Sequence, residues 1–274
     1  MIDLKNVKLT ASMRRKINEL RRVPAQFRFI DVARLAIIVP YRNRREHLER
    51  FVPHLSRHLE KQKLNFQILL VEQLDTLPFN RAALLNAGVQ FCQDQCDAFC
   101  FHDVDLFPET AAYRCGTQPL NLISLTIQER TLQHKEVDQH YFGGVTMISR
   151  DQFFQINGFS NRFWGWGLED DNFLFRCLYS GLQPCRMMTS TYLELSHVPA
   201  LKSDIHGNPA TRKELNRNRR VLRRGRSYQS RIKRGLHDPW NDGIKELTVS
   251  LIDMDPLEGV QRVGVDFSGL GRSV

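Results

Sequence analysis

The chain has 274 residues, of which 42% are hydrophobic and 25% charged, and this composition excludes a chain that is disordered throughout. Lys and Arg number 39 against 30 Asp and Glu, an excess of nine cations that favours an anionic ligand or surface. No run approaches the about 18 apolar residues that would span a bilayer, so a single large water-soluble domain is expected.

The first half of the chain predicts a sheet with crossover helices. Residues 1–34 are expected to form a peripheral N-terminal arm, because chain ends order loosely unless they dock. From Leu35 onward, short apolar runs alternate with segments of helical period. The pattern predicts strands at Leu35–Val39, Phe66–Val71 and Ala98–Phe101, and helices over Leu48–Leu59 and Arg81–Gln93. Such a βαβαβ unit binds ligands beyond the carboxyl ends of its strands.

The second half is less regular, but it contains no internal repeat or low-complexity linker. The pattern predicts strands at Leu122–Ile127, Gly143–Ser149 and Leu247–Asp253, and helices at Arg150–Ile156 and Asn172–Ser180. Residues 35–274 are therefore expected to form one α/β domain.

The six cysteines are too few for a disulfide scaffold, and reduced core thiols are the default expectation. Cys92, Cys96 and Cys100 are spaced by four, but the last falls in a predicted strand and no CxxC motif is present. A structural zinc site is therefore not favoured.

Residues 212–234 contain eleven cations and one acid. A charge run of this kind is usually a solvated helical face without a partner. The functional alternative is a surface for nucleic acid, anionic lipid or a phosphorylated acceptor. The run has one aromatic residue, Tyr228, whereas proteins that bind single-stranded nucleic acid interleave several stacking rings, so nucleic acid is not expected.

Two aspartates, Asp103 and Asp105, follow the third predicted strand. Residues two apart in extended backbone point to the same side, so both carboxylates can face the crevice at the sheet edge. Such oxygen ligands suit Mg²⁺ or Mn²⁺, which can bridge them to a diphosphate. An isolated Asp-x-Asp usually marks a turn, and only its place at a strand end favours a functional role.

Two arginines, Arg42 and Arg44, follow the first predicted strand. Guanidinium groups at this spacing can make forked hydrogen bonds to a phosphate or a pyrimidine carbonyl. Taken alone, they would be surface arginines.

Two tryptophans, Trp164 and Trp166, alternate with glycines just before three consecutive acids. Tryptophans separated by glycine can form a movable flat surface that stacks on sugar rings. The alternative is a helix N-terminus that carries carboxylates, which the helix dipole favours. A helix cap alone would need only one acid and would not explain the two tryptophans, so the capping interpretation accounts for only part of this motif.

Seven motifs occur together in one order: Pro40-Tyr41-Arg42-Asn43-Arg44, Phe79-Asn80-Arg81-Ala82, Asp103-Val104-Asp105, Tyr113-Arg114-Cys115, Tyr141-Phe142-Gly143-Gly144-Val145, Asn157-Gly158-Phe159, and the run from Trp164 to Asp171. In order and spacing the chain resembles the β-1,4-galactosyltransferases, glycosyltransferase family 7. The resemblance extends from about Ile37 to His197 and weakly on to Asp266.

The resemblance implies a GT-A fold, a Rossmann-like nucleotide-binding sheet with crossover helices, that transfers galactose from UDP-galactose with inversion and uses Mn²⁺. Residues 35–110 would be the nucleotide-binding half, and residues 111–274 the acceptor-binding and lid half. The donor-binding residues that it implies are Pro40, Arg42, Arg44, Phe79, Arg81, Asp103, Tyr141, Gly144 and Trp166.

By the same resemblance, Asp170 matches the catalytic base, and Glu169 and Asp171 match contacts of the acceptor hydroxyl. Trp166 matches the tryptophan of the closing loop, and Asp105 a metal ligand. Inversion by a single displacement needs one general base beside the acceptor and a cation that neutralises the leaving diphosphate. Asp170 and a metal on Asp105 would supply both.

Two segments depart from the family pattern. His197 is kept as a metal ligand, but the carboxylate of Glu194 stands where a soft ligand is expected, which should make Mg²⁺ more acceptable beside Mn²⁺. The alternative for His197 is a buried histidine that bonds to backbone. Arg212 matches a family residue on the acceptor side, but the aromatic residue that follows it in the family is absent here. The identity of the acceptor is therefore not determined by the resemblance.

Tyr141 matches the family position beside the 2-hydroxyl of the donor sugar, where a bulky side chain leaves little room for an N-acetyl group. UDP-galactose is therefore expected as the donor, unless Tyr141 only packs at the strand entrance. The alternatives are the same fold with another UDP-sugar such as UDP-GalNAc, or a non-catalytic basic binding protein.

The expected partners are a UDP-sugar donor, a glycan or glycolipid acceptor, and an anionic membrane that contacts residues 212–234. The first 35 residues are charged and unlike a signal peptide. A cytoplasmic, membrane-associated enzyme of bacterial type is expected. The alternative is the catalytic fragment of a Golgi-lumen enzyme without its anchor.

Overall fold

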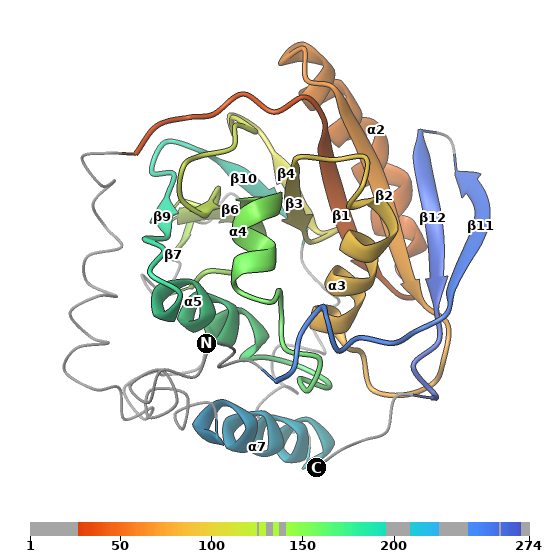
Figure 1. Cartoon of the computed structure of the whole chain (residues 1–274). Helices are drawn as coiled ribbons and strands as arrows, with labels where there is room; N and C mark the ends of the chain where they lie inside the picture. The colour runs from red at the N-terminus through yellow and green to blue at the C-terminus, as the bar shows by residue number, and fades with distance from the viewer. Residues whose placement is uncertain are drawn as a thin grey trace.

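Two sheets and five helices make up the described part of the computed structural model, which is residues 27–124, 126–129, 134–136, 141–195, 209–224, 241–257 and 259–269 (Figure 1). The strands are β1 (Leu35–Tyr41), β2 (Phe66–Gln73), β3 (Ala98–His102), β4 (Leu106–Pro108), β5 (Leu120–Asn121), β6 (Thr126–Glu129), β7 (His134–Glu136), β8 (Val145–Ser149), β9 (Cys185–Arg186), β10 (Tyr192–Glu194), β11 (Leu251–Leu257) and β12 (Val260–Val265). The helices are α2 (Arg45–Lys61), α3 (Arg81–Cys92), α4 (Arg150–Gln155), α5 (Glu169–Tyr179) and α7 (Pro209–Arg224).

The larger sheet has eight strands in the order β11-β12-β2-β1-β3-β8-β5-β9, and the smaller has four in the order β4-β10-β6-β7. Strands β12, β2, β1 and β3 run parallel, with antiparallel neighbours at β11 and β8. The βαβαβ unit predicted from the sequence is confirmed as β1-α2-β2-α3-β3. Because these strands are parallel, their carboxyl ends meet at one edge of the sheet.

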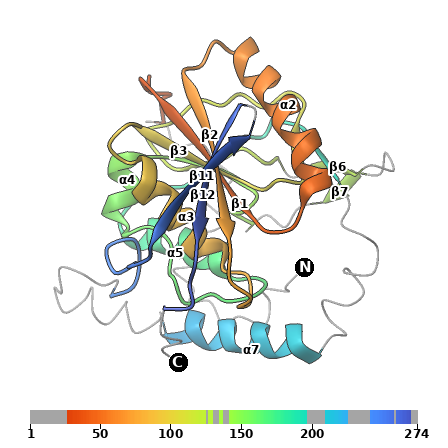
Figure 2. The same ribbon diagram turned by 90° about the vertical axis from the view of Figure 1, so that its right-hand side faces the viewer.

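Two hydrophobic cores lie on the two faces of this sheet. Strand β1 alternates between them, since Ala36 and Ile38 belong to one core and Ile37 and Val39 to the other. Helix α2 covers the second core, and α3, α4 and α5 cover the first, so the helices flank the sheet on both sides (Figure 2). Burial on both faces explains why the parallel strands are almost wholly apolar.

Helix α3 lies unusually close to the sheet. A Cβ atom on Gly88 would come within 2.5 Å of Ile38 Cγ2 and 2.9 Å of Val71 Cγ2. Asn80 starts the helix by accepting a hydrogen bond from the backbone N–H of Ala83 at 2.9 Å. The residues that precede α3 are thereby fixed at the carboxyl end of β2.

The three consecutive acids form the first turn of α5, so this helix begins at Glu169 and not at Asn172 as the sequence pattern predicted. Leu168 precedes it in a left-handed conformation with φ 77°. The three acids therefore do lie at a helix N-terminus, as the alternative interpretation expected. This position alone does not exclude a catalytic role, which depends on the side chains around them.

The predicted strand at Leu122–Ile127 is wrong at its start, because the chain turns there and Leu122–Ser124 are not in a strand. The side chain of Asn121 accepts a hydrogen bond from the backbone N–H of Ile123 at 3.0 Å, which ends β5. The next strand, β6, belongs to the smaller sheet. The late strand predicted at Leu247–Asp253 lies further along the chain, as β11, and its partner β12 was not predicted.

Residues 27–34, the described part of the expected N-terminal arm, contact the body of the protein. Phe29 forms a bridge to Gly116, and the backbone N–H of Ile30 donates to the carbonyl of Cys115 at 2.9 Å. All six cysteines are buried and free, as expected for reduced core thiols. Among the described helices, none is long and apolar enough to cross a bilayer.

Candidate active site

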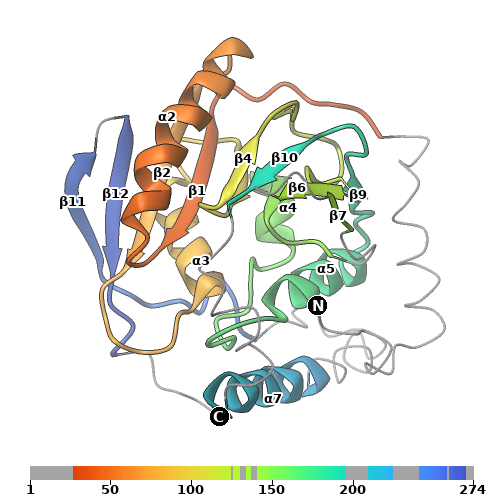
Figure 3. The ribbon, with the colours of Figure 1, turned by 180° about the vertical axis from the view of Figure 1, so that it is seen from behind.

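Five of the segments predicted from the motifs lie at the carboxyl edge of the parallel strands (Figure 3 shows this sheet from behind). They follow β1, precede α3, follow β3, precede β8 and begin α5. Backbone bonds tie these segments together, since Asp103 donates from its N–H to the carbonyl of Gly144 at 3.0 Å. The fold therefore brings five distant segments into one site.

Arg81 stands at the centre of the acidic residues. Its Nε and Nη2 atoms each lie 2.8 Å from Asp103 Oδ1, and Nη1 lies 3.8 Å from Glu169 Oε1. Burial alone would lower the pKa of Arg81, but the neighbouring carboxylates of Asp103 and Glu169 raise it above its ordinary value. Arg81 is thus a permanent cation that joins the end of β3 to the start of α5.

Asp170 lies over the backbone of Gly143. A Cβ atom on Gly143 would collide with Asp170 Oδ2 and come within 2.9 Å of the Tyr141 ring, so only glycine leaves room for this arrangement. Burial, together with Asp103 and Asp170, raises the pKa of Tyr141 well above its ordinary value. Asp170, Tyr141 and Gly143 therefore form one wall of the site.

Three carboxyl groups of this site, those of Glu169, Asp170 and Asp103, are protonated more readily than ordinary ones. Burial and the neighbouring Asp170 raise the pKa of Glu169 to about 7, and burial raises that of Asp170. The pKa of Asp103 is also raised by burial, against the opposing effect of Arg81. Raised carboxyl pKa values in a water-poor site are the condition for general base catalysis near neutral pH.

Two of the candidate metal ligands, Asp105 and Glu194, lie just before β4 and at the end of β10. Glu194 in β10 pairs with Leu106 in β4, one residue from Asp105, and the backbone N–H of Leu195 donates to the Asp105 carbonyl at 2.8 Å. Arg44 Nη1 lies 3.6 Å from Asp105 Oδ2. Carboxylate oxygens fit Mn²⁺ or Mg²⁺. The third expected ligand, His197, lies outside the described residues, and within those described no three metal-binding side chains form a group.

The donor side of the site is formed by β1 and the segment before α3. Pro40 is buried in β1, and Arg42 Nη1 donates to the carbonyl of Leu77 at 2.6 Å. The Arg42 guanidinium also lies 5.3 Å from the centre of the Phe79 ring. Arg42 is therefore held in place before any ligand arrives.

The two tryptophans have different environments. Trp164 is buried, with its ring 5.9 Å from that of Phe267, whereas Trp166 is 41% exposed.

The two other residues expected on the acceptor side are Asp171 and Arg212. Asp171 follows Asp170, whose Oδ1 accepts a hydrogen bond from the Asp171 N–H at 2.9 Å. Arg212 is exposed at the start of α7, the helix that lies beside this loop.

The sequence motifs did not identify three supporting side chains. Asn121 donates to the carbonyl of Gly143 at 2.8 Å, and Arg186 donates to the carbonyl of Tyr141. The two N–H groups of the Asn218 side chain, in α7, lie within hydrogen-bond distance of three carbonyl oxygens of the tryptophan loop. A signal for the last was present, because Leu215, Asn218 and Leu222 share one face of a helix within the basic run.

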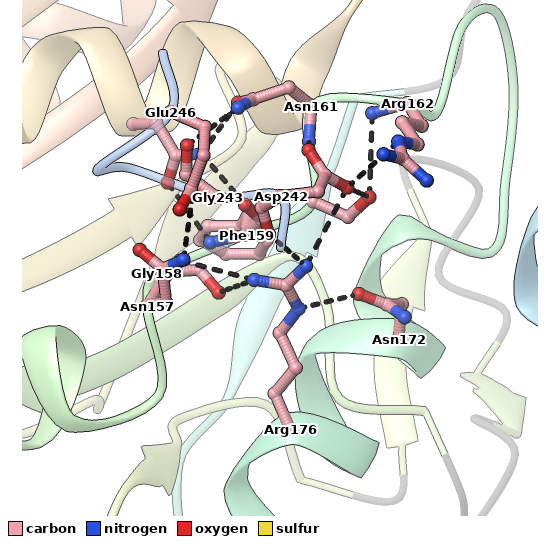
Figure 4. Close-up of polar contacts among 12 residues, drawn as sticks. Asn157, Gly158, Phe159, Asn161, Arg162, Asn172, Arg176, Asp242, Gly243 and Glu246 are labelled. Atoms are coloured by element: carbon pink, nitrogen blue, oxygen red, sulfur yellow. Dashed lines mark hydrogen bonds and ion pairs between the residues drawn. The ribbon is translucent and has the colours of Figure 1, made fainter. Parts of the chain in front are cut away.

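A second buried charge cluster holds α5 against the rest of the protein (Figure 4). Arg176 Nη1 lies 3.1 Å from the carbonyls of Asn157 and Gly158, and Nη2 lies 2.6 Å from that of Asp242. The Asp242 carboxylate lies 3.7 Å from Arg176 Nη2 and accepts hydrogen bonds from Ser160 and from the Asn161 N–H. This cluster fixes the direction in which α5 presents its acids.

Comparison with known proteins finds two family models that match consecutive parts of the chain. The N-terminal region of glycosyl transferase group 7 matches residues 14–116, and the N-terminal domain of galactosyltransferase matches residues 125–198. Beta-1,4-galactosyltransferase 4 of Cricetulus griseus is 44% identical over 149 residues, 53% of this chain and 42% of that protein. Beta-1,4-galactosyltransferase 7 of Drosophila melanogaster is 39% identical over 173 residues, 61% of this chain and 53% of that protein. The chain spans about half the length of these relatives.

Two solved structures of the Drosophila beta-1,4-galactosyltransferase 7 share the fold. Its catalytic domain in complex with xylobiose has a TM-score of 0.60 at 27% identity, over 85% of this chain and 92% of that chain. A mutant of the same enzyme, in complex with manganese, UDP-Gal and xylobiose, has a TM-score of 0.59 with the same identity and coverage. The predicted GT-A glycosyltransferase fold is confirmed.

Proposed function

The chain belongs to the glycosyltransferase group 7 family, and from this we propose that it transfers galactose from UDP-galactose to a sugar hydroxyl of a glycan or glycolipid, with inversion and a β-1,4 linkage. The observation that carries the proposal is the convergence of Asp170, Tyr141 and the Arg81–Asp103 pair at the carboxyl edge of the parallel strands. The manganese, UDP-Gal and xylobiose bound to the similar Drosophila enzyme support the same donor, metal and class of acceptor.

In this reaction, Asp170 would accept the proton of the acceptor hydroxyl as that oxygen attacks the sugar. Its raised pKa suits this role, because a base with a pKa nearer neutrality drives proton transfer better than an ordinary aspartate. Glu169 and Asp171 flank it and would bind neighbouring hydroxyls. Trp166, exposed beside them, would stack on a sugar ring.

The donor would lie across the ends of β1 and β3. Arg42 and Arg44 would bind the diphosphate, and Phe79 and Pro40 would contact the uridine. Asp105 and Glu194, with His197, would hold Mn²⁺, and the metal supplies positive charge to the leaving diphosphate. Tyr141 would exclude an N-acetyl group from the sugar 2-position.

A membrane surface is proposed as a partner of the basic run. The described part of that run, on α7, turns Leu215, Asn218 and Leu222 inward and exposes Arg212, Lys213 and Arg220. Clustered cations contribute about 1 kcal/mol each near an anionic bilayer. This favours an enzyme that works at the anionic cytoplasmic face of a membrane on a lipid-linked acceptor, and salt-sensitive flotation with anionic vesicles would test it.

The decisive test of the transfer reaction is a donor and acceptor screen that measures UDP release with and without Mn²⁺. We expect release with UDP-galactose to depend on both the metal and a sugar acceptor. The matched control is Asp105→Asn, which should lose the metal dependence and the activity together. Transfer that proceeds equally well in EDTA, or a clear preference for UDP-GalNAc, would contradict the proposal.

A further inference from the structure

The segment 164–168, which carries Trp166 to the start of α5, has a backbone that needs support from outside. Gly165 has φ 73° and Gly167 φ 92°. Leu168 has φ 77°, a left-handed conformation that is unfavourable for a residue with a side chain. Such a conformation persists only where surrounding contacts determine it.

Asn218 of α7 provides these contacts. Its side chain is fully buried, and Nδ2 lies 3.2 Å from the carbonyl oxygen of Trp164, 3.4 Å from that of Trp166 and 3.0 Å from that of Gly167. The Asn218 Oδ1 atom has no partner in the described part of the chain. A reversed amide would place that oxygen against three carbonyls, so the amide has one orientation.

Glu214, one turn earlier in α7, supports the same segment. A Cβ atom on Gly165 would overlap the Glu214 carboxylate, so the helix and the loop are in close contact. The backbone of Trp166 lies close enough to the Glu214 carboxylate to oppose the rise in the pKa of Glu214 that burial causes. Two side chains on one face of α7 therefore contact the loop, Asn218 at three of its carbonyls and Glu214 at Gly165 and the backbone of Trp166.

The loop conformation affects both substrates. The N–H of Gly165 donates to the carbonyl of Phe79 at 2.8 Å, on the donor side. Trp164 anchors the loop in the core, and Trp166 projects into solvent. Leu168 then leads directly into Glu169 and the base Asp170. A shift of the loop would therefore move the stacking ring relative to the base.

We propose that Asn218, assisted by Glu214, is a positioning residue of the transferase, which sets the conformation of residues 164–168 and so the place of Trp166 beside Asp170. The role in catalysis rests on the proposed function. The contact itself does not, and it can be measured without substrate.

The test compares Asn218→Ala and Asn218→Asp with Asn216→Ala, which removes an exposed asparagine from the same helix. Hydrogen exchange of the amides of residues 164–168 should become about tenfold faster or more in Asn218→Ala, and faster still in Asn218→Asp, whose carboxylate repels the carbonyls. The KM for the sugar acceptor should rise about tenfold, against a change of less than about threefold for UDP-galactose. Asn216→Ala should match the wild type in each measurement.

Equal loop exchange and equal acceptor KM in Asn218→Ala and Asn216→Ala would overturn the proposal. So would a rise of both substrate KM values by one factor together with general loss of protection, which would show a structural role only. If the wild type transfers no galactose, but loop exchange changes in the Asn218 variants alone, the proposed function fails and the positioning of the loop stands.

Discussion

Helix α5 carries two clusters of buried charge, one at each end, and they are built in opposite ways. Around Arg176, each part of the guanidinium has an oxygen partner, and the Asp242 carboxylate is bonded on both oxygens. Around Glu169 and Asp170, acids outweigh cations, and Glu169 Oε2 is buried without a hydrogen bond in the described structure. One cluster is complete within the protein, whereas the other is not.

The difference indicates what each cluster does. A buried ion pair with all its hydrogen bonds made stabilises one arrangement of the chain, and its loss leaves an uncompensated charge. Carboxylates kept together with too few cations cost stability, and such sites are retained where a proton, metal or substrate completes them. The same helix is thus rigidly held at one end and reactive at the other.

The largest expected effect is on catalysis, from Asp170→Asn. The amide cannot accept the proton of the acceptor hydroxyl, so kcat should fall about 10²–10⁴-fold. The free energy of unfolding should stay equal or rise, because a carboxylate is removed from an acidic cluster. Steady-state kinetics and urea unfolding measure both, with Asp151→Asn, at an exposed position of α4, as the control. Near wild-type turnover would remove Asp170 from the role of base.

Arg176→Met should act in the opposite way, on stability first. It removes the buried cation that faces the Asp242 carboxylate, and the expected loss in the free energy of unfolding is about 3–5 kcal/mol. Arg162→Met removes a partly exposed partner of the same carboxylate and should cost less than about 1 kcal/mol. Equal losses for the two variants, measured by urea unfolding, would show that burial does not distinguish them.

The third prediction concerns the pH dependence of stability. The pKa of Glu169 is about 7 in the folded protein against an ordinary value of 4.5, so the folded state holds a proton that the unfolded chain has lost. The free energy of unfolding should therefore decrease as pH rises from about 4.5 to 7, by up to about 3 kcal/mol. Glu169→Gln should remove the Glu169 part of this decrease in metal-free protein, and the raised pKa values of Asp103 and Asp170 account for what remains. An unchanged pH profile in the variant would assign the titration to another group.

The smallest expected effect is on donor choice. Tyr141→Leu opens space beside Gly143 and Gly144 and should shift the ratio of GalNAc to galactose transfer by about 1–3 kcal/mol, while some galactose transfer remains. Competition between the two UDP-sugars in one reaction measures this ratio directly. A wild type that uses both donors equally, or a variant with an unchanged ratio, would exclude the steric explanation.

The sequence predicted best the features that depend on residues close together in the chain. The βαβαβ half followed from apolar runs and helical periods, and the motifs placed Arg81, Asp103 and Asp170 at one sheet edge. It failed where one side chain redirects the chain, as Asn121 does by bonding to the N–H of Ile123. It also failed for Asn218, since a contact between α7 and the tryptophan loop depends on how distant segments pack.

Strand β12 pairs with its neighbour β11 and also with the remote strand β2, and the remote pairing has a consequence for how the protein folds. Residues 260–265 fill the place beside β2, so Leu69 and Val71 lack that neighbour until the late part of the chain has been synthesised. Contacts of such separation form slowly, and an open strand edge invites pairing with other chains. The finished edge, β11, carries Asp253, Asp255 and Pro256, residues that resist further strand addition. The nascent chain is therefore most prone to aggregate before β12 docks.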